Sequence, residues 1–185
     1  MQRFNISGRF ILTVTSLEWR KNVTGLLTAF DLCRQKYKIP HKLLIAGGER
    51  RAKAKDIDRL YKKLGLEGSV YFLGHLSIKE LNYLYNTAEA LVFPSFYEGF
   101  GLPPLEAMAC ATPVVASDIP VFKEILLDAA LFADPYDPMD IAEKIYQATA
   151  NETLRNNLVK KGLQRVKEFS WARTAQQMLD IFNAL

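Results

Sequence analysis

The chain has 185 residues, of which 49% are hydrophobic, and a formal net charge of +4. This length suits one domain with a substantial core and is short for two domains. The sequence has no apolar run of eighteen residues and no signal-peptide pattern at residues 1–9, which argues against a membrane-spanning or exported protein and predicts a cytoplasmic one.

The positive charge is concentrated in the first part of the chain. Residues 1–63 hold fifteen Lys and Arg against five Asp and Glu, and the remaining residues hold nine against fifteen. A basic half can contact phosphate groups, a membrane surface or nucleic acid. The basic run at 50–63 is not interleaved with stacking aromatics, so we expect no nucleic-acid partner. Peripheral contact with the inner face of a membrane stays open.

Apolar runs and amphipathic stretches alternate along the chain. Six short apolar runs predict strands near Phe10–Thr15, Lys42–Ala46, Ser69–Leu73, Ala90–Phe93, Pro113–Ala116 and Ala130–Ala133. Eight stretches predict helices near Val23–Lys38, Ala54–Leu64, Ile78–Thr87, Pro104–Cys110, Val121–Leu126, Met139–Ala150, Glu152–Glu168 and Trp171–Leu185. This alternation favours an α/β fold, a doubly wound, Rossmann-like parallel sheet with its ligand crevice at the carboxyl ends of the strands.

Helix ends follow from short polar residues. Asn22, Ser77 and Asp137 are expected to cap helix N-termini. The last two helices have no strand between them, so we expect them to pack across the edge of the sheet, with Trp171 as their anchor. One domain, 1–185, therefore ends in the C-terminal helices of residues 150–185.

The loop after the first predicted strand carries two cations. Arg20 and Lys21 stand where a helix is about to begin. Cationic side chains and a helix N-terminus both carry positive charge, so together they form a clamp for a diphosphate. The alternative is a solvated Arg-Lys pair in front of a cap.

The next two loops are less specific. Gly47 and Gly48 predict a tight turn at the floor of the crevice, and a ligand contact is an equal alternative. Gly74 and His75 follow the third strand. His75 has no carboxylate or nucleophile partner in the sequence, so we do not expect it to act as a general base. His41, which precedes a strand, is expected at the surface.

The stretch Tyr97–Asp118 joins the fourth and fifth strands through a turn and a helix. Gly99 and Gly101 allow the turn to approach a ligand closely, and Pro103 suits a first helical turn. The N–H groups at the start of this helix suit a phosphate.

Two carboxylates belong to the same stretch. Glu98 lies in the loop and Glu106 lies eight residues later, in the helix. Carboxylates suit sugar hydroxyls. A crevice that offers both carboxylates and phosphate-binding N–H groups therefore indicates a nucleotide sugar.

No metal site is visible in the sequence. Cys33 and Cys110 show no metal-ligand spacing and are expected to be buried free thiols. There is no His/Cys cluster and no D-x-D beside a strand. We expect neither a metal ion nor a cofactor.

E-G-F-G-L-P-P-L-E at residues 98–106 resembles the E-x7-E signature of the retaining glycosyltransferases of family 4, which have the GT-B fold. Further stretches match in the family's order: R-K-N at 20–22, L-I-A-G-G at 44–48, V-Y-F-L-G-H at 70–75, F-P-S at 93–95, T-P-V-V-A-S at 112–117 and F-S-W at 169–171. An ordered series over nearly the whole chain is far more specific than a lone E-x7-E.

The resemblance implies an activity. A sugar would pass from a nucleoside diphosphate to a hydroxyl acceptor, such as a polysaccharide or a lipid-linked glycan, with its anomeric configuration retained and without a metal ion. Glu98 would bind the donor sugar and Glu106 the ribose. Arg20 and Lys21 would stabilise the departing diphosphate. Many family members have Gly-Arg where this chain has Thr15-Ser16, so the resemblance puts the arginine role on Arg20.

The resemblance also assigns the donor-binding loops. The N–H groups of the turn that starts at Gly99, those of Phe100, Gly101 and Leu102, would face the sugar and the diphosphate. The nucleobase would meet the backbone of Gly74 and His75, and Gly47 would line the crevice.

A GT-B enzyme has two Rossmann-like domains, and this chain resembles the C-terminal, donor-binding one. The N-terminal acceptor domain is absent and would be supplied by a longer chain or by a partner chain. Two alternatives stay open: a nucleotide-sugar-binding module without turnover, and a fragment of a GT-B sugar-nucleotide epimerase. The sugar, the base and the acceptor stay open as well.

Overall fold

The computed structural model describes residues 7–48 and 55–184. Its strands form a single parallel sheet in the order β3-β2-β1-β4-β5-β6. The bounds are β1 Phe10–Val14, β2 Lys42–Ala46, β3 Val70–Gly74, β4 Ala90–Phe93, β5 Val114–Ser117 and β6 Ala130–Ala133. The predicted strands and the doubly wound topology are confirmed. The order reverses between β1 and β4, which is the position at which open α/β sheets bind ligands.

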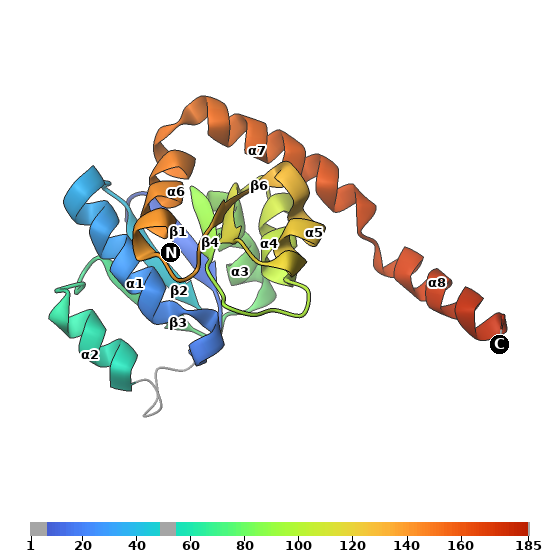
Figure 1. Ribbon diagram of the computed structural model, residues 1–185, viewed down its shortest axis with the longest axis horizontal. Helices are drawn as coiled ribbons and strands as arrows, with labels where there is room; N and C mark the ends of the chain where they lie inside the picture. The colour runs from blue at the N-terminus through green and yellow to red at the C-terminus, as the bar shows by residue number, and fades with distance from the viewer. Residues whose placement is uncertain (1–6, 49–54, 185) are drawn as a thin grey trace.

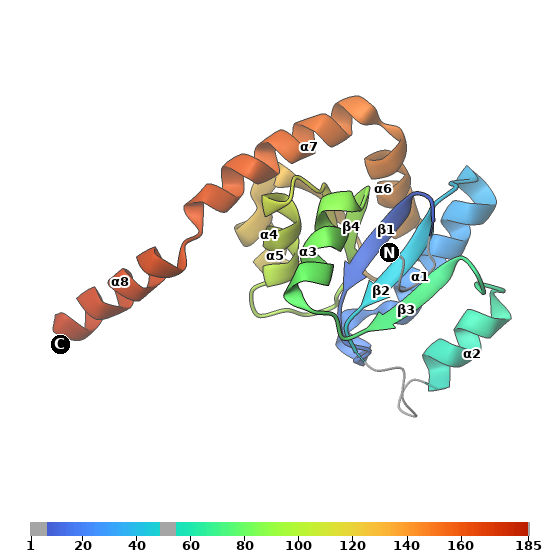
Figure 2. The ribbon, with the colours of Figure 1, turned by 180° about the vertical axis from the view of Figure 1, so that it is seen from behind.

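Helices cover both faces of the sheet. The bounds are α1 Val23–Leu32, α2 Lys55–Lys63, α3 Ile78–Thr87, α4 Leu102–Ala109, α5 Pro120–Leu126, α6 Pro138–Ala150, α7 Glu152–Arg165 and α8 Trp171–Asn183. A π-helical turn, Cys33–Tyr37, extends α1 to nearly its predicted length. The start predicted for α2 at Ala54 lies outside the described residues. Helices α1, α2 and α6 cover one face (Figure 1), and α3, α4 and α5 cover the other (Figure 2).

The predicted caps begin their helices. The side chains of Asn22, Ser77 and Asp137 accept hydrogen bonds from backbone N–H groups in the first turns of α1, α3 and α6. At Ser77 the cap is reciprocal, because Glu80 binds back to the Ser77 N–H group. These bonds satisfy N–H groups that a helix start leaves unpaired.

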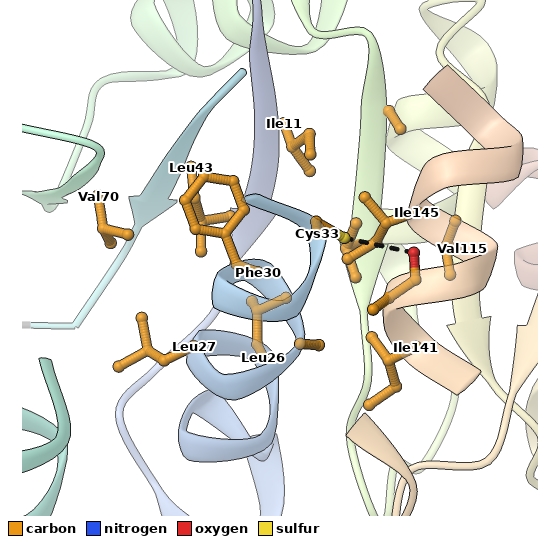
Figure 3. Close-up of a cluster of buried hydrophobic side chains, with 14 of the residues drawn as sticks. Ile11, Leu26, Leu27, Phe30, Cys33, Leu43, Val70, Val115, Ile141 and Ile145 are labelled. Carbon is orange, nitrogen blue, oxygen red and sulfur yellow. Dashed lines mark hydrogen bonds between the residues drawn. The ribbon is translucent and has the colours of Figure 1, made fainter. Parts of the chain in front are cut away.

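The core between α1, α6 and the sheet is apolar and contains one thiol (Figure 3). Phe30 and Ile145 are fully buried there. The Cys33 Sγ donates a hydrogen bond to the carbonyl of Ala142 at 3.3 Å. Cys33 is the buried free thiol that was predicted. Burial raises the pKa of this thiol to about 12, which makes it unreactive. Cys110 is only half-buried, which corrects the prediction for it.

His41 is buried and not at the surface, so that prediction is wrong. Its Nε2 lies 2.8 Å from Glu89 Oε2, and Glu89 also pairs with Arg9. The three side chains come from three segments that meet at the amino end of the sheet. A partner 48 residues away cannot be found from local sequence.

The C-terminal tail divides into a packed helix and a projecting one. Helix α7 lies on the domain, where Leu158 is buried and Gly162 packs against Met108. Helix α8 projects away from the domain (Figures 1 and 2), and none of its residues is buried. The prediction that both helices pack on the sheet is therefore wrong for α8, and Trp171, which is 79% exposed, does not anchor them here.

Candidate functional site

The loops that follow β1 and β4 meet at one edge of the sheet. The two strands are parallel neighbours, with Leu12 opposite Leu91. Beyond their ends, the Phe96 N–H donates to the carbonyl of Arg20 at 2.8 Å. The two loops singled out in the sequence are therefore joined by a backbone hydrogen bond at the switch point of the sheet.

This junction brings Arg20, Lys21 and Glu98 together. Lys21 Nζ lies 2.5 Å from Glu98 Oε1, and an Arg20 terminal nitrogen lies 3.3 Å from Glu98 Oε2. The Glu98 and Lys21 side chains are only 9% and 12% exposed. An ion pair that is largely removed from water is screened little by salt. The three residues predicted to be catalytic thus form one partly buried charge cluster.

Glu18 extends the cluster toward solvent. Its carboxylate accepts hydrogen bonds from Arg20 Nε at 2.8 Å and from the Ser16 hydroxyl at 3.0 Å. These bonds, with the Arg20 bond the larger influence, hold the pKa of Glu18 below its usual range. Arg20 is therefore held between two carboxylates, Glu18 and Glu98, which orient its guanidinium group.

Asn22 ties three loops together beneath the cluster. It is buried and has left-handed backbone angles, with φ 54°. Its Nδ2 donates to the carbonyl of Pro94 at 3.0 Å and to that of Pro135 at 2.7 Å. Its Oδ1 accepts from the Gly25 N–H at 3.2 Å. The sequence predicted the cap at Asn22 and missed the tether, because the two carbonyls belong to distant loops.

Helix α4 begins at Leu102, directly after Gly101. Gly101 has φ +101°, and a Cβ at this position would lie 2.5 Å from the Phe122 ring. Only glycine fits that backbone and that contact. The helix therefore starts close to the sheet edge, with its positive N-terminal end beside the Glu98 loop. Gly99 has no neighbour that would exclude a side chain, and Phe100 and Leu102 are exposed.

Glu106 lies one turn into α4 and is held by a tyrosine. The Tyr85 hydroxyl, from α3, donates to Glu106 Oε2 at 2.7 Å. Burial and then this hydrogen bond raise the pKa of Tyr85, so the phenol stays a donor at neutral pH. The sequence analysis did not identify Tyr85. The feature that could have identified it is its position on the apolar side of α3.

The glycine loops after β2 and β3 touch each other. The Gly47 N–H donates to the Gly74 carbonyl at 2.8 Å, and both glycines have positive φ. A Cβ on Gly47 would lie 2.7 Å from the carbonyl oxygen of Thr15. Gly48 lies in a bend, and the residues that follow it lie outside the described ones, so the tight turn after β2 stays a prediction. His75 follows this contact and is exposed.

The described residues contain neither a group of metal ligands nor a helix that could span a membrane. Within residues 7–48 and 55–184, no three His, Cys, Asp or Glu side chains are grouped so that they could hold a metal ion. The helices of the same residues include none that has both the length and the apolar character to cross a bilayer. Independence from metals and a cytoplasmic location stay predictions.

Sequence comparison links the chain to proteins that transfer sugars. The family model described as "Glycosyl transferases group 1" matches residues 2–165. The O-antigen chain mannosyltransferase B of Escherichia coli is 34% identical over 100% of this chain and 49% of its own length. The mannosylfructose-phosphate synthase of Agrobacterium fabrum is 31% identical over 96% of this chain and 41% of its own length. The chain thus spans about half the length of these curated relatives.

Solved structures share the fold. Sucrose-phosphate synthase from Thermosynechococcus elongatus superposes with a TM-score of 0.85 at 29% identity, over 99% of this chain and 47% of that chain. Anabaena Alr3699/HepE, solved in complex with UDP-glucose, superposes with a TM-score of 0.87 at 20% identity, over 100% of this chain and 51% of that chain. At 20% identity the second likeness shows the fold alone.

Proposed function

Because this chain belongs to the group 1 glycosyl transferases, we propose that it is the donor-binding half of an enzyme that transfers a sugar from a nucleoside diphosphate to a hydroxyl group. The acceptor is a polysaccharide or a lipid-linked glycan, and the transferred sugar keeps its anomeric configuration. The supporting observation is the cluster of Lys21, Arg20 and Glu98 at the β1–β4 switch point, beside the start of α4.

The pair of Lys21 and Glu98 has a direct consequence for donor binding. The Lys21 ammonium binds one oxygen of the Glu98 carboxylate at 2.5 Å, and Arg20 binds the other oxygen at 3.3 Å. A diphosphate competes for Lys21 and Arg20, and each bond that it takes from Glu98 releases a carboxylate oxygen. The released oxygen is then an acceptor for a hydroxyl of the donor sugar. Diphosphate binding therefore prepares Glu98 for the sugar.

The same cations act again during transfer. Negative charge grows on the diphosphate as the sugar departs, and donors fixed before the reaction stabilise that charge without reorganising. Loss of the Lys21 ammonium should reduce the rate by about 10²–10³, the usual effect of removing one such donor. The N–H groups at the start of α4 contribute in the same direction.

Glu106 serves the nucleoside end of the donor. Its second oxygen is held by Tyr85, which leaves the carboxylate oriented for the two hydroxyls of a ribose. The backbone at Gly74 and His75 would meet the base, and Gly47 would support the crevice wall.

A second domain completes the enzyme. The chain spans about half of its relatives, and the apolar side chains of α8 have no cover within this domain. We propose that the acceptor domain, in the same longer chain or in a partner, contributes the other wall of the crevice. The exposed basic side chains of α2, Lys55, Arg59, Lys62 and Lys63, suit peripheral contact with an anionic membrane surface.

The test is calorimetric titration with UDP, GDP, ADP and their sugar conjugates. One nucleotide series should bind, binding should weaken with salt and survive EDTA, and Lys21→Ala should abolish most of it. Lys161→Ala is the matched control, because Lys161 pairs with Asp128 at 2.7 Å on α7, away from the crevice. A wild-type chain that binds none of the three series contradicts the proposal.

Two further variants test the separate roles of the carboxylates. Glu106→Ala should weaken the nucleotide and its sugar conjugate to the same degree. Glu98→Ala removes the competitor of Lys21, so the nucleoside diphosphate should bind equally well or better, while the extra affinity due to the sugar disappears. Equal losses for both ligands in both variants would show that these roles are assigned incorrectly.

A further inference from the structure

Three aromatic rings from three loops form a stack beside the charge cluster. The Trp19 and Phe96 rings lie 5.9 Å apart at 29°, and the Phe96 and Tyr136 rings lie 4.8 Å apart at 23°. Trp19 follows β1, Phe96 follows β4 and Tyr136 follows β6. Trp19 is 80% exposed and Tyr136 is 76% exposed. Large aromatic rings that are grouped and this exposed to solvent usually mark a binding surface.

A hollow of about 310 Å³ opens beside this stack. Its lining includes the exposed Trp19, the partly buried Phe96, and the buried residues Val23 and Ile57. Polar groups come from the side chains of Glu18, Thr24 and Asp56. The hollow therefore combines flat apolar rings with two carboxylates and a hydroxyl.

This combination fits one chemical class well. A pyranose ring has a C–H face that stacks on an aromatic ring, and an equatorial rim of hydroxyls that donate to carboxylates. A protein partner fits less well, because covering the carboxylates would remove two exposed ion pairs from water, those of Glu18 with Arg20 and of Asp56 with Arg59, and the desolvation of ion pairs is costly. The Asp56 side chain is 89% exposed and that of Glu18 is 57% exposed, so both are available to hydroxyls at the rim.

The stack is held in place before any ligand arrives. Asn22 binds the carbonyls of Pro94 and Pro135, and these residues belong to the loops that carry Phe96 and Tyr136. Asn22 itself lies three residues after Trp19. The loops that carry the three rings are thus tied to one side chain, which lowers the entropy lost when a ligand binds.

We propose that this hollow, the Trp19 site, is a second sugar-binding site that takes one pyranose ring of a glycan. It adjoins the donor crevice, because Trp19 precedes Arg20 and Phe96 lies two residues before Glu98. Identification of that glycan as the acceptor rests on the proposed function. The binding of a neutral sugar at Trp19 does not.

The experiment measures saccharide binding to the 185-residue chain by saturation-transfer NMR and titration. The probes are methyl glycosides and disaccharides of mannose, glucose and N-acetylglucosamine, with UDP and GDP measured in parallel. Wild type should bind a saccharide in the millimolar range, and Trp19→Ala should weaken it about tenfold while changing nucleotide affinity by less than about twofold. Trp171→Ala is the matched control, because this tryptophan is 79% exposed on α8 and should leave both affinities unchanged.

A second variant keeps the proposal testable if Trp19→Ala does not fold. Asp56→Ala changes an exposed side chain on α2 and should weaken the saccharide about threefold, the loss expected for one hydrogen bond to a carboxylate in water. Saccharide binding that Trp19→Ala and Asp56→Ala both weaken supports the site, whatever the nucleotides do.

Four results would overturn the proposal. Nucleotide binding without any saccharide binding removes the Trp19 site and leaves the proposed donor function standing. An equal loss of saccharide in Trp171→Ala shows that the contact is nonspecific. A Trp19→Ala variant that keeps its saccharide affinity but fails to associate with an added acceptor domain makes the stack a domain contact. If neither ligand class binds, both proposals fail.

Discussion

At the scale of single residues, Asn22 connects the fold to the site. It caps α1, occupies a left-handed conformation that few residues accept, and donates to two carbonyls in other loops. Lys21 precedes it, and Glu98 follows Pro94 by four residues. The distance between the two charged side chains therefore depends on Asn22.

Asn22→Asp should show this dependence. The new carboxylate still accepts from Gly25, but it places an acceptor against two carbonyl acceptors in a buried position. We expect the free energy of unfolding to fall by about 2–4 kcal/mol, and nucleotide affinity to fall at temperatures where the variant is fully folded. Denaturant melts and titrations measure the two effects. Thr28→Ala, on the same helix, is the control and should change stability by less than about 0.5 kcal/mol.

Glu89, at the other end of the sheet, makes the stability of the fold depend on pH. Burial raises the pKa of its carboxyl, but hydrogen bonds from Arg9 and His41 outweigh burial, and the pKa lies below the usual value of 4.5. A carboxyl with a depressed folded-state pKa stabilises the fold above its unfolded pKa and loses that contribution as the pH falls through the folded one.

The stability difference between wild type and Glu89→Gln should follow this rule. It should be fully present above about pH 5 and shrink as the pH falls below 4.5. Thermal melts between pH 3 and pH 7 measure it. A difference that stays constant over this range would show that Glu89 does not stabilise the fold as a paired carboxylate.

At the scale of elements, α7 and α8 differ in what they bury. Leu158 and Gly162 are buried on α7. The apolar side chains of α8, among them Met178 and Phe182, are more than half exposed. A helix of 13 residues without packing is marginal in water, so α8 requires a partner surface to be stable.

Removal of residues 170–185 should therefore leave the domain intact. We expect the melting temperature to change by less than about 2 °C and nucleotide affinity to stay the same, while helical circular dichroism decreases. Removal of residues 152–185, which also takes α7, should destabilise the domain strongly because Met108 and its neighbours lose their cover. Equal effects of the two truncations would mean that α8 packs on the domain in solution.

At the scale of the whole molecule, the proposed donor crevice lies at one edge of the sheet, and this chain supplies one wall of it. Positioning of two reactants can lower a barrier by roughly 7–11 kcal/mol, and a crevice open to water weakens each electrostatic contact within it.

The isolated chain should therefore bind donor but transfer its sugar slowly. Addition of an acceptor domain, in the same chain or separately, should restore transfer with retained configuration. A radiolabelled-donor assay with and without that domain measures this. Full-rate transfer by the 185-residue chain alone would show that it carries a complete acceptor site.

The sequence alone determined the features that depend on neighbouring residues. Apolar runs predicted the strands to within one residue at each end, and Asn22, Ser77 and Asp137 were identified as caps because a cap acts within its own first turn. The loops at Arg20 and Glu98 were placed at one edge because parallel strands end on the same side.

Only the tertiary structure decided which side chains meet. The pairs Lys21 with Glu98, Tyr85 with Glu106 and His41 with Glu89 join segments 77, 21 and 48 residues apart. Their contact depends on strand order and helix placement, which no local pattern encodes. Exposure of α8 was missed for the same reason, since an amphipathic stretch shows that a face must be covered and not what covers it.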